Sequence, residues 1–355
     1  MKIGILTYHR AHNYGAVLQA IATRIVFQRM GHEVFYIDYH PLYHRNYYKL
    51  FSWHYLIKYR RKYLLHRLHF WNAIKRRIAC FERDFENYIS PYCLPYDTKH
   101  SYDLIVYGSD QIWRKQASSQ SFDPVFLGDN LLQTPRHVTY AASMGLLQTK
   151  DSDKEFLRRS LIRFSSISVR EKQLQDYLLE LGIQSTLVCD PTLLLTAEEW
   201  DNVLHPQPIH NDGYVLFYSL HENDFDRKAI QDYADVNHLH VVEIKGNAGK
   251  DSENVYSQCG VWEFISLIKY ANCIFTTSYH GLAFSLIYHK EFFCSFKKNA
   301  DRAQSLLEHL HLQERMLEVH APHIPTPIPI NYKETSILLD TFIKNSYTYI
   351  NEIIK

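Results

Sequence analysis

The residues best suited to chemistry lie in the stretch 273–290, CIFTTSYHGLAFSLIYHK. An apolar run typical of a buried strand ends in small hydroxyl residues, and Tyr279, His280 and Gly281 follow at the start of a helical pattern. His280 is therefore expected at a helix N-terminus, which favours anions and opposes a charged imidazole. A bound phosphate would offset that opposition and keep His280 protonated, as a general acid must be. The alternative is a His that caps the helix or packs between domains.

Two other polar residues also follow predicted strands. Arg170 offers a guanidinium that binds a carboxylate or phosphate through two parallel hydrogen bonds, although a salt bridge with Glu171 is the alternative. Asp110 either takes the proton of a hydroxyl group or caps a helix that begins at Gln111. Because ligands of parallel α/β sheets bind beyond the carboxyl ends of the strands, we expect these residues to face one cleft.

The elements that would position these residues alternate between strand and helix. The opening predicts a strand at 2–7, a helix from about Val17 to Met30 and a strand at 33–39, which is a typical start of a parallel sheet covered by helices. Further strands are predicted at 101–110, 137–143, 166–171, 214–220, 240–245 and 272–277. No internal sequence repeat is visible.

The alternation predicts two α/β domains. We place their boundary near Pro191, which gives an N-terminal domain at 1–190 and a C-terminal domain at 191–330. A last helical pattern within 331–355 could return to the first domain.

Composition and cysteine spacing exclude several classes of protein. The chain of 355 residues is 46% hydrophobic and 22% charged, which is typical of a globular protein. Its six cysteines form no CxxC pair, and no His/Cys cluster has the spacing of zinc ligands, so we expect no metal. No signal-peptide core and no apolar stretch of about 18 residues are present. We therefore expect a cytoplasmic protein.

A basic insert at 42–90 interrupts the first domain. Ten lysines and arginines and no acidic residue lie between Asp38 and Glu82; since the whole chain carries +1, the remainder carries −9. Apolar residues recur in the insert at helical spacing, namely Ile57, Leu64, Leu68, Trp71, Ile74 and Ile78. This stripe is expected to pack on the core, but the charge implies an anionic partner.

The partner we expect is an anionic membrane surface. The residues expected to contact it are Lys58, Arg60, Arg61, Lys62, Arg76 and Arg77. A nucleic acid is the alternative, because basic residues interleaved with aromatic ones suit single strands. The negative charge of the remaining chain would repel it, and we expect no nucleic-acid partner.

Seven short motifs occur in the order seen in the polysaccharide pyruvyl transferase family, which the chain resembles over residues 3–316. They are Asn13-Tyr14-Gly15-Ala16 with Leu18 and Gln19, Gly108-Ser109-Asp110-Gln111 with Trp113, Tyr140-Ala141-Ala142-Ser143 with Gly145, Ser168-Val169-Arg170-Glu171, Asp190-Pro191-Thr192, Thr277-Ser278-Tyr279-His280-Gly281, and Arg302 with Leu306, Leu307 and Arg315. The chain departs from the family pattern at 42–90, at Ser278, where some members have a basic residue, and at His311, where the last motif usually has Gly.

The resemblance implies a fold similar to the GT-B glycosyltransferases, with two Rossmann-like domains, the first on the acceptor side and the second on the donor side. It implies transfer of a pyruvyl group from phosphoenolpyruvate to two hydroxyls of a hexose or N-acetylhexosamine, which forms a ketal during capsular or exopolysaccharide biosynthesis. No cofactor is implied. A nucleotide-sugar glycosyltransferase of the same fold and a nucleic-acid-binding protein are the alternatives.

The resemblance also implies roles for individual residues. His280 is the expected acid and Asp110 the expected base. Donor binding is expected of Arg170, Tyr279, Ser278 and Arg302, with Lys297 as a further cation. Acceptor binding is expected of Asn13, Tyr14, Gly15, Gln111 and Trp113, where the rings of Tyr14 and Trp113 either stack on a sugar or belong to the core. A lipid-linked acceptor would place the protein at the inner face of the membrane.

Overall fold

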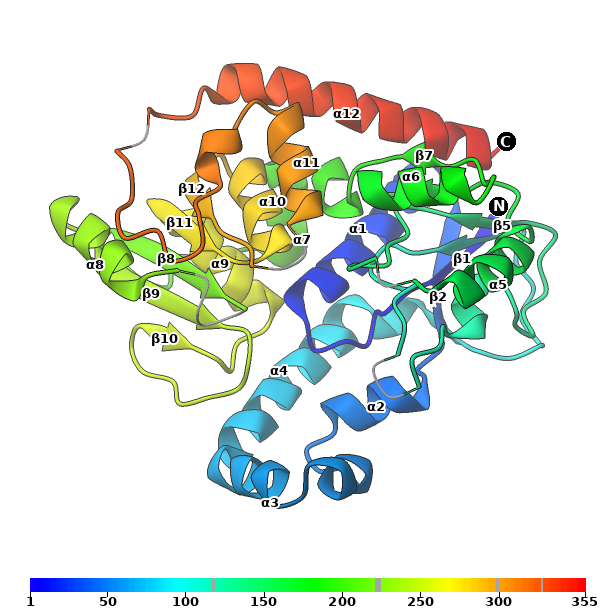
Figure 1. The fold of residues 1–355 in the computed structure, drawn as a ribbon, viewed down its shortest axis with the longest axis horizontal. Coiled ribbons are helices and arrows are strands. Elements are labelled where there is room, and N and C mark those ends of the chain that lie inside the picture. The colour runs from blue at the N-terminus through cyan, green and yellow to red at the C-terminus, as the bar shows by residue number, and fades with distance from the viewer. Residues whose placement is uncertain (117–118, 148, 221–224, 298–299, 327) are drawn as a thin grey trace.

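The computed structural model describes residues 1–355 apart from 117–118, 148, 221–224, 298–299 and 327, and apart from the side chains at 54–55 and 58–60. Two parallel sheets lie side by side, each covered by helices, and a basic helical insert projects from them (Figure 1). This arrangement confirms the predicted α/β class and the two Rossmann-like domains.

The first sheet has the strand order β3-β2-β1-β4-β5, and all its strands are parallel. Its strands are β1 (Lys2–Leu6), β2 (Glu33–Asp38), β3 (Cys93–Pro95), β4 (Leu104–Tyr107) and β5 (His137–Thr139). The helices around it are α1 (Tyr14–Arg29), α5 (Asp151–Leu161) and α6 (Lys172–Glu180). A short parallel pair, β6 (Ser168–Val169) and β7 (Thr186–Leu187), lies beside β5 and carries Arg170 at its end.

The second sheet has the order β10-β9-β8-β11-β12, which repeats the topology of the first sheet although the sequence shows no repeat. Its strands are β8 (Tyr214–Ser219), β9 (His240–Lys245), β10 (Val255–Tyr256), β11 (Cys273–Thr276) and β12 (Glu291–Cys294). Its helices are α8 (Arg227–Val236), α9 (Val261–Tyr270), α10 (Tyr279–Ile287) and α11 (Asp301–His309).

The ends of α1 and β4 differ from their predicted bounds for local reasons. The helix begins at Tyr14 rather than Val17, because the Asn13 side chain accepts a hydrogen bond from the backbone N–H of Ala16 at 3.1 Å. The strand ends at Tyr107, where Gly108 adopts φ 110°. A Cβ at Gly108 would lie 2.4 Å from the carbonyl oxygen of Tyr140, so only glycine fits this close approach.

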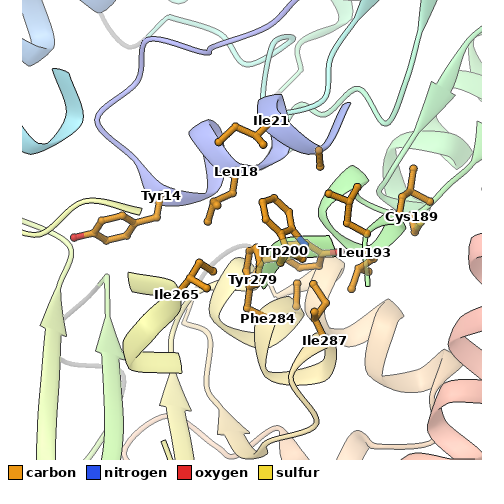
Figure 2. Close-up of a cluster of buried hydrophobic side chains, with 14 of the residues drawn as sticks. Tyr14, Leu18, Ile21, Cys189, Leu193, Trp200, Ile265, Tyr279, Phe284 and Ile287 are labelled. Carbon is orange, nitrogen blue, oxygen red and sulfur yellow. The ribbon is translucent and has the colours of Figure 1, made fainter. Parts of the chain in front are cut away.

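One hydrophobic core runs through both domains. Helix α1 is buried along most of its length, and Figure 2 shows its Leu18 and Ile21 on the side of Trp200, whereas its Tyr14 points the other way. Trp200 belongs to α7 (Ala197–Leu204), which follows the 3-10 turn η3 (Pro191–Leu194) that lies between the sheets in sequence. This core cluster contains residues of both domains, so they pack together through apolar side chains.

The last helix, α12 (Tyr332–Ile353), runs back across the molecule to the first domain (Figure 1). The Tyr349 hydroxyl donates to the carbonyl oxygen of Thr139 at 2.8 Å, and Arg136 donates to that of Ile353 at 2.8 Å. Within the described part of the chain, no helix is both long enough and apolar enough to span a membrane.

The insert folds into α2 (Leu42–Tyr48), α3 (Trp53–His69) and α4 (Trp71–Tyr88). Helix α4 docks between the domains, where Arg77 donates to the Tyr14 hydroxyl of the first domain at 3.1 Å and to the carbonyl oxygen of Ser257 in the second at 2.9 Å. Buried Asp84 accepts from the backbone N–H of Val261 at 2.7 Å and so caps α9. The expectation that Arg77 contacts a membrane is therefore wrong, because Arg77 is buried between the two domains.

Candidate active site

The carboxyl ends of the strands in the two domains face each other and gather a group of charged side chains. Arg170, which follows β6, is the centre of this group, and its side chain is only 1% exposed. Its Nη1 donates to Asp190 Oδ2 at 2.5 Å and to Ser109 Oγ at 2.9 Å. Arg170 is thus held by two segments of the first domain before any ligand arrives.

His280 lies in the first turn of α10 and faces this arginine cluster from the second domain. Its Nε2 lies 3.7 Å from Asp190 Oδ2, which is too long for a hydrogen bond. The other edge of the ring packs on α1, since a Cβ added to Gly15 would lie 2.0 Å from His280 Nδ1. Gly15 therefore makes room for the imidazole.

Arg302, in the first turn of α11, supplies a second cation. Its guanidinium lies 5.0 Å from the centre of the Tyr279 ring, and its Nε lies 3.5 Å from Glu171 Oε1. Glu171 is itself buried and accepts a hydrogen bond from Ser143 Oγ at 2.6 Å. Arg170, Arg302, Asp110 and Asp190 thus act on the charge of His280, while Glu171 lies against the two arginines.

Four buried nitrogen atoms in this cluster make no hydrogen bond within the described residues. They are Arg170 Nε, Arg170 Nη2, Arg302 Nε and His280 Nε2. Each lies 3.5–3.7 Å from a carboxylate oxygen, so the arginine charges are compensated although none of the four atoms is hydrogen-bonded. Leaving a buried donor unpaired costs about 1–3 kcal/mol, so four such atoms in one place make this cluster the candidate site.

The protonation states follow from burial and from the neighbouring charges. The pKa of His280 is lowered to about 4, chiefly by burial; Asp190 opposes this shift, and Arg170 and Arg302 add to it. Burial also raises the pKa of Glu171 and lowers that of Arg302. Burial alone would raise the pKa of Asp190, but Arg170 and His280 bring it below its usual value. His280 is therefore neutral at pH 7 in the ligand-free protein.

Asp110 lies at the first-domain wall of the site. Its Oδ1 accepts from the backbone N–H of Gln111 at 2.7 Å and lies 3.6 Å from Arg170 Nη2, and its side chain is 20% exposed. The alternative of a helix N-cap is wrong, because the residues after Asp110 form a turn and not a helix. Asp110 has φ 74°, a left-handed conformation that is uncommon for residues with a side chain and often occurs at functional sites.

Tyr14 and Trp113 belong to the core instead of an acceptor surface. The Tyr14 ring stacks on Phe264 at 4.7 Å, and Trp113 Nε1 donates to the carbonyl oxygen of Phe126 at 3.0 Å. Both side chains are 1% exposed, so neither ring face is open to a sugar. The stacking role expected for these two residues is therefore wrong.

The remaining expected site residues lie around the cluster. Ser278 is buried, and its backbone N–H donates a hydrogen bond to Thr276 Oγ1 at 3.1 Å. Tyr279 is also buried, and the Arg302 guanidinium lies over its ring. Asn13 caps α1, while Gln111 packs against Gly145 and accepts from Arg114 Nη1 at 3.1 Å. Lys297 is exposed.

The roles of Asp190 and Glu171 were missed in the sequence, although both occur in its motifs. Asp190 Oδ1 accepts from the backbone N–H of Thr192 at 3.0 Å and from its hydroxyl at 2.8 Å, which leaves Oδ2 for Arg170 and His280. The spacing Asp-Pro-Thr is the signal for such a side-chain turn. Its pairing with His280 spans 90 residues of sequence and appears only in the fold.

One group of side chains in the described part of the chain has the composition of a metal site. His9, Asp38 and Cys93 place one ligand atom each within 4.8 Å of one another, beside a pocket of about 620 Å³. Arg10 already binds both oxygens of Asp38, at 2.5 and 2.6 Å, so we describe this group as an ion-paired cluster. Sequence spacing missed it because the three residues come from three segments.

The fold and the site define a two-domain α/β protein with two parallel sheets of the same strand order and a charged site between their carboxyl ends. The family model for polysaccharide pyruvyl transferase matches residues 13–295, and the chain belongs to this transferase family. The comparison with curated proteins found no match.

Several solved structures are similar in outline. The UDP-GlcNAc 2-epimerase of Methanocaldococcus jannaschii is 12% identical, with 100% of this chain and 99% of that chain covered and a TM-score of 0.47. A putative UDP-N-acetylglucosamine 2-epimerase from Listeria monocytogenes is 8% identical, with 98% and 90% covered and a TM-score of 0.48. A protein of uncharacterized function from Klebsiella pneumoniae is 15% identical, with 70% and 87% covered and a TM-score of 0.41.

Proposed function

We propose that the protein transfers a pyruvyl group from phosphoenolpyruvate to two hydroxyl groups of a hexose or N-acetylhexosamine, forming a ketal during capsular or exopolysaccharide biosynthesis. The observation that carries the proposal is the set of unpaired buried nitrogens of Arg170, Arg302 and His280. Phosphoenolpyruvate carries a phosphate and a carboxylate, and planar guanidinium groups bind both well. The same ligand would supply the negative charge that His280 needs in order to hold a proton.

The reaction begins with proton transfer from His280 Nε2 to the methylene carbon of the donor, which becomes a methyl group. The adjacent carbon becomes an oxocarbenium-like centre, and an acceptor hydroxyl adds to it while Asp110 takes the hydroxyl proton. Phosphate then leaves with the electrons of its C–O bond. The second hydroxyl attacks the same carbon, and its proton goes to the phosphate; Asp110 returns its proton to His280 through solvent. Donor and diol thus give ketal and inorganic phosphate.

The residues of the site fit the separate tasks of this reaction. Asp110 is partly exposed at the first-domain wall, which suits a base that meets an incoming acceptor. Arg170 is immobilised by Asp190 and Ser109 and so can orient a donor at low entropic cost. The proposal requires no cofactor, and it leaves open a lipid-linked or nucleotide-linked acceptor.

The direct test combines the protein with phosphoenolpyruvate and a panel of simple and lipid-linked galactosides and N-acetylhexosaminides. We expect acceptor-dependent release of phosphate and a product heavier by one pyruvyl ketal. A matched sample of His280→Ala should give neither signal. Release of a nucleoside diphosphate from a nucleotide sugar, with no phosphate from phosphoenolpyruvate, would replace the proposal by glycosyl transfer.

A further inference from the structure

The insert carries a concentration of exposed apolar side chains. Of the sixteen large hydrophobic residues that are exposed in the described part of the chain, eight lie within residues 42–71. They are Leu42, Tyr47, Trp53, Ile57, Leu64, Leu65, Leu68 and Trp71. Trp53 is 71% exposed and Ile57 is 75% exposed, although both lie on a regular helix. Contiguous exposed apolar surface on a protein usually marks a site of interaction.

Four of these residues form a stripe along α3, which the sequence predicted to pack on the core. At about 100° per residue, Trp53, Ile57, Leu64 and Leu68 fall within an arc of roughly 60° around the helix. Arg61 and Arg67 fall on the two sides of this arc. Arginines that flank an exposed apolar stripe are typical of a helix that lies in a membrane interface.

The helix is carried on a fixed support. Figure 1 shows α3 at the outer end of the insert, away from the two sheets. Helix α4, which follows it after Phe70, is held by Arg77 and Asp84 to the second domain, as described above. The backbone N–H of Ser52 donates to the Tyr63 hydroxyl at 2.9 Å and ties the start of α3 to its own middle. The apolar stripe therefore belongs to a helix with a fixed position, and its exposure does not reflect incomplete packing of the insert.

The charge around the stripe indicates the chemistry of its partner. Arg61, Lys62, Lys75 and Arg76 are exposed, and no acidic residue lies between Asp38 and Glu82. A nucleic acid would use the cations but would gain little from Ile57, Leu64 and Leu68. An anionic lipid surface uses both kinds of side chain, since acyl chains take the apolar stripe and headgroups take the cations.

We propose that α3 and the first turns of α4 dock the protein on an anionic membrane surface, with Trp53, Ile57, Leu64 and Leu68 in the interface and Arg61, Lys62, Lys75 and Arg76 on the headgroups. Docking does not depend on the proposed reaction; it would explain how that reaction reaches a lipid-linked acceptor. The insert is also anchored to the first domain, because His44 of α2 stacks on Tyr8 at 4.5 Å in the segment between β1 and α1.

Sedimentation with vesicles tests the proposal without any activity measurement. We expect the protein to sediment at low salt with vesicles of equal phosphatidylcholine and phosphatidylserine, but only weakly with phosphatidylcholine alone. The fourfold variant R61Q/K62Q/K75Q/R76Q should bind at least about a hundredfold more weakly, since each cation near such a surface contributes about fivefold. Salt above about 0.5 M should weaken binding as well, because it screens these charges.

Matched control variants show whether vesicle binding depends on the insert itself or only on the protein's total charge and exposed apolar surface. The control for charge is K99Q/K228Q/K250Q/K333Q, four exposed lysines elsewhere. The triple variant W53S/I57S/L68S should also lose vesicle binding, while L131S/I162S/V236S, exposed residues outside the insert, should keep it. All the altered side chains are exposed, so thermal unfolding of the variants should match that of the parent protein.

Several results would overturn the proposal. The proposal fails if the parent protein does not sediment with the vesicles at low salt. It also fails if the insert variants bind the vesicles as well as their control variants do. Binding of single-stranded RNA at moderate salt without vesicle binding would assign the surface to nucleic acid. Concentration-dependent dimers that disappear in W53S/I57S/L68S, again without vesicle binding, would assign it to a second copy of the chain. A variant that loses vesicle binding but keeps activity on a soluble acceptor leaves the proposed reaction standing.

Discussion

The two domains have the same strand order, but the carboxyl ends of their strands are built differently. At the first domain, Arg170 is fastened to Asp190 at 2.5 Å and to Ser109 at 2.9 Å. At the second, His280 and Arg302 approach their nearest carboxylates only to 3.7 and 3.5 Å. Arg170 of the first domain is therefore held in place before a ligand binds, whereas His280 and Arg302 of the second domain have polar atoms without such fixed partners. We therefore expect Arg170 of the first domain to orient the substrate and His280 of the second domain to supply the reacting proton.

The largest effect is expected from removing His280, the proposed proton donor in the second domain. His280→Ala should lower the rate at saturating phosphoenolpyruvate by about 10²–10⁴-fold, the usual contribution of general acid catalysis. The variant should stay folded at the assay temperature, although loss of the largely buried ring should lower its melting temperature somewhat. Replacement of the exposed His323 by Ala is the control. A variant that keeps more than half of the parent rate would remove His280 from the reaction.

A smaller but still large effect is expected from Gly15, which sits against the imidazole. The Cβ of Gly15→Ala would lie 2.0 Å from His280 Nδ1, so the ring must move by an ångström or more. Misplacement on that scale can cost about 10²-fold in rate. Gly249→Ala is the matched control, because its Cβ would meet nothing closer than 3.7 Å. Unchanged turnover in Gly15→Ala would mean that the position of His280 is unimportant.

The two arginines should differ in what their replacement affects. Arg170→Lys retains the charge but loses the forked contacts, so we expect the KM for phosphoenolpyruvate to rise about ten- to hundredfold together with a lower melting temperature. Arg302→Lys should raise the KM without a comparable loss of stability, since its Nε makes no hydrogen bond within the described residues. Steady-state kinetics and thermal unfolding measure both quantities. An unchanged KM in Arg170→Lys would place that residue outside the donor site.

The smallest expected effect is a change in protonation. The free protein holds His280 neutral, with a pKa of about 4, and an anionic donor should raise this pKa. Binding should therefore take up as much as one proton near pH 6 and tighten as the pH falls. Calorimetry in buffers of different ionisation enthalpy measures this uptake. His280→Ala corrects for the phosphate, which itself titrates near pH 6; equal uptake by both proteins would contradict the prediction.

The same depressed pKa has a consequence for stability in the absence of donor. An unfolded His has a pKa of about 6.5, so the unfolded chain binds a proton before folded His280 does. The stabilisation from neutral His280 is fully present above pH 6.5 and is lost as the pH falls toward 4. The donor should reduce that loss, because raising the pKa of folded His280 brings it closer to that of the unfolded chain; thermal unfolding at pH 5 with and without phosphoenolpyruvate measures this.

The sequence by itself determined the elements and the chemistry-bearing residues. Alternation and helical spacing located the strands, including 240–245 at its observed bounds and 272–277 within one residue at each end. The motifs identified the family, and the position of His280 after a strand predicted it as a site residue, a prediction that the experiments above test. These features are local, because a residue's neighbours in sequence decide whether it lies in a strand, at a strand end or at a helix start.

Only the tertiary structure decided which side chains are covered and which groups pair. Tyr14 and Trp113 looked available for a sugar but are buried by segments far away in sequence. Arg77 looked like a surface cation but is enclosed by the second domain, while the stripe on α3 looked like a core face but is exposed. The depressed pKa of His280 likewise depends on burial and on Arg170 and Arg302, which come from other segments. Burial and electrostatics are set by what packs against a residue, and periodicity along the chain cannot supply that partner.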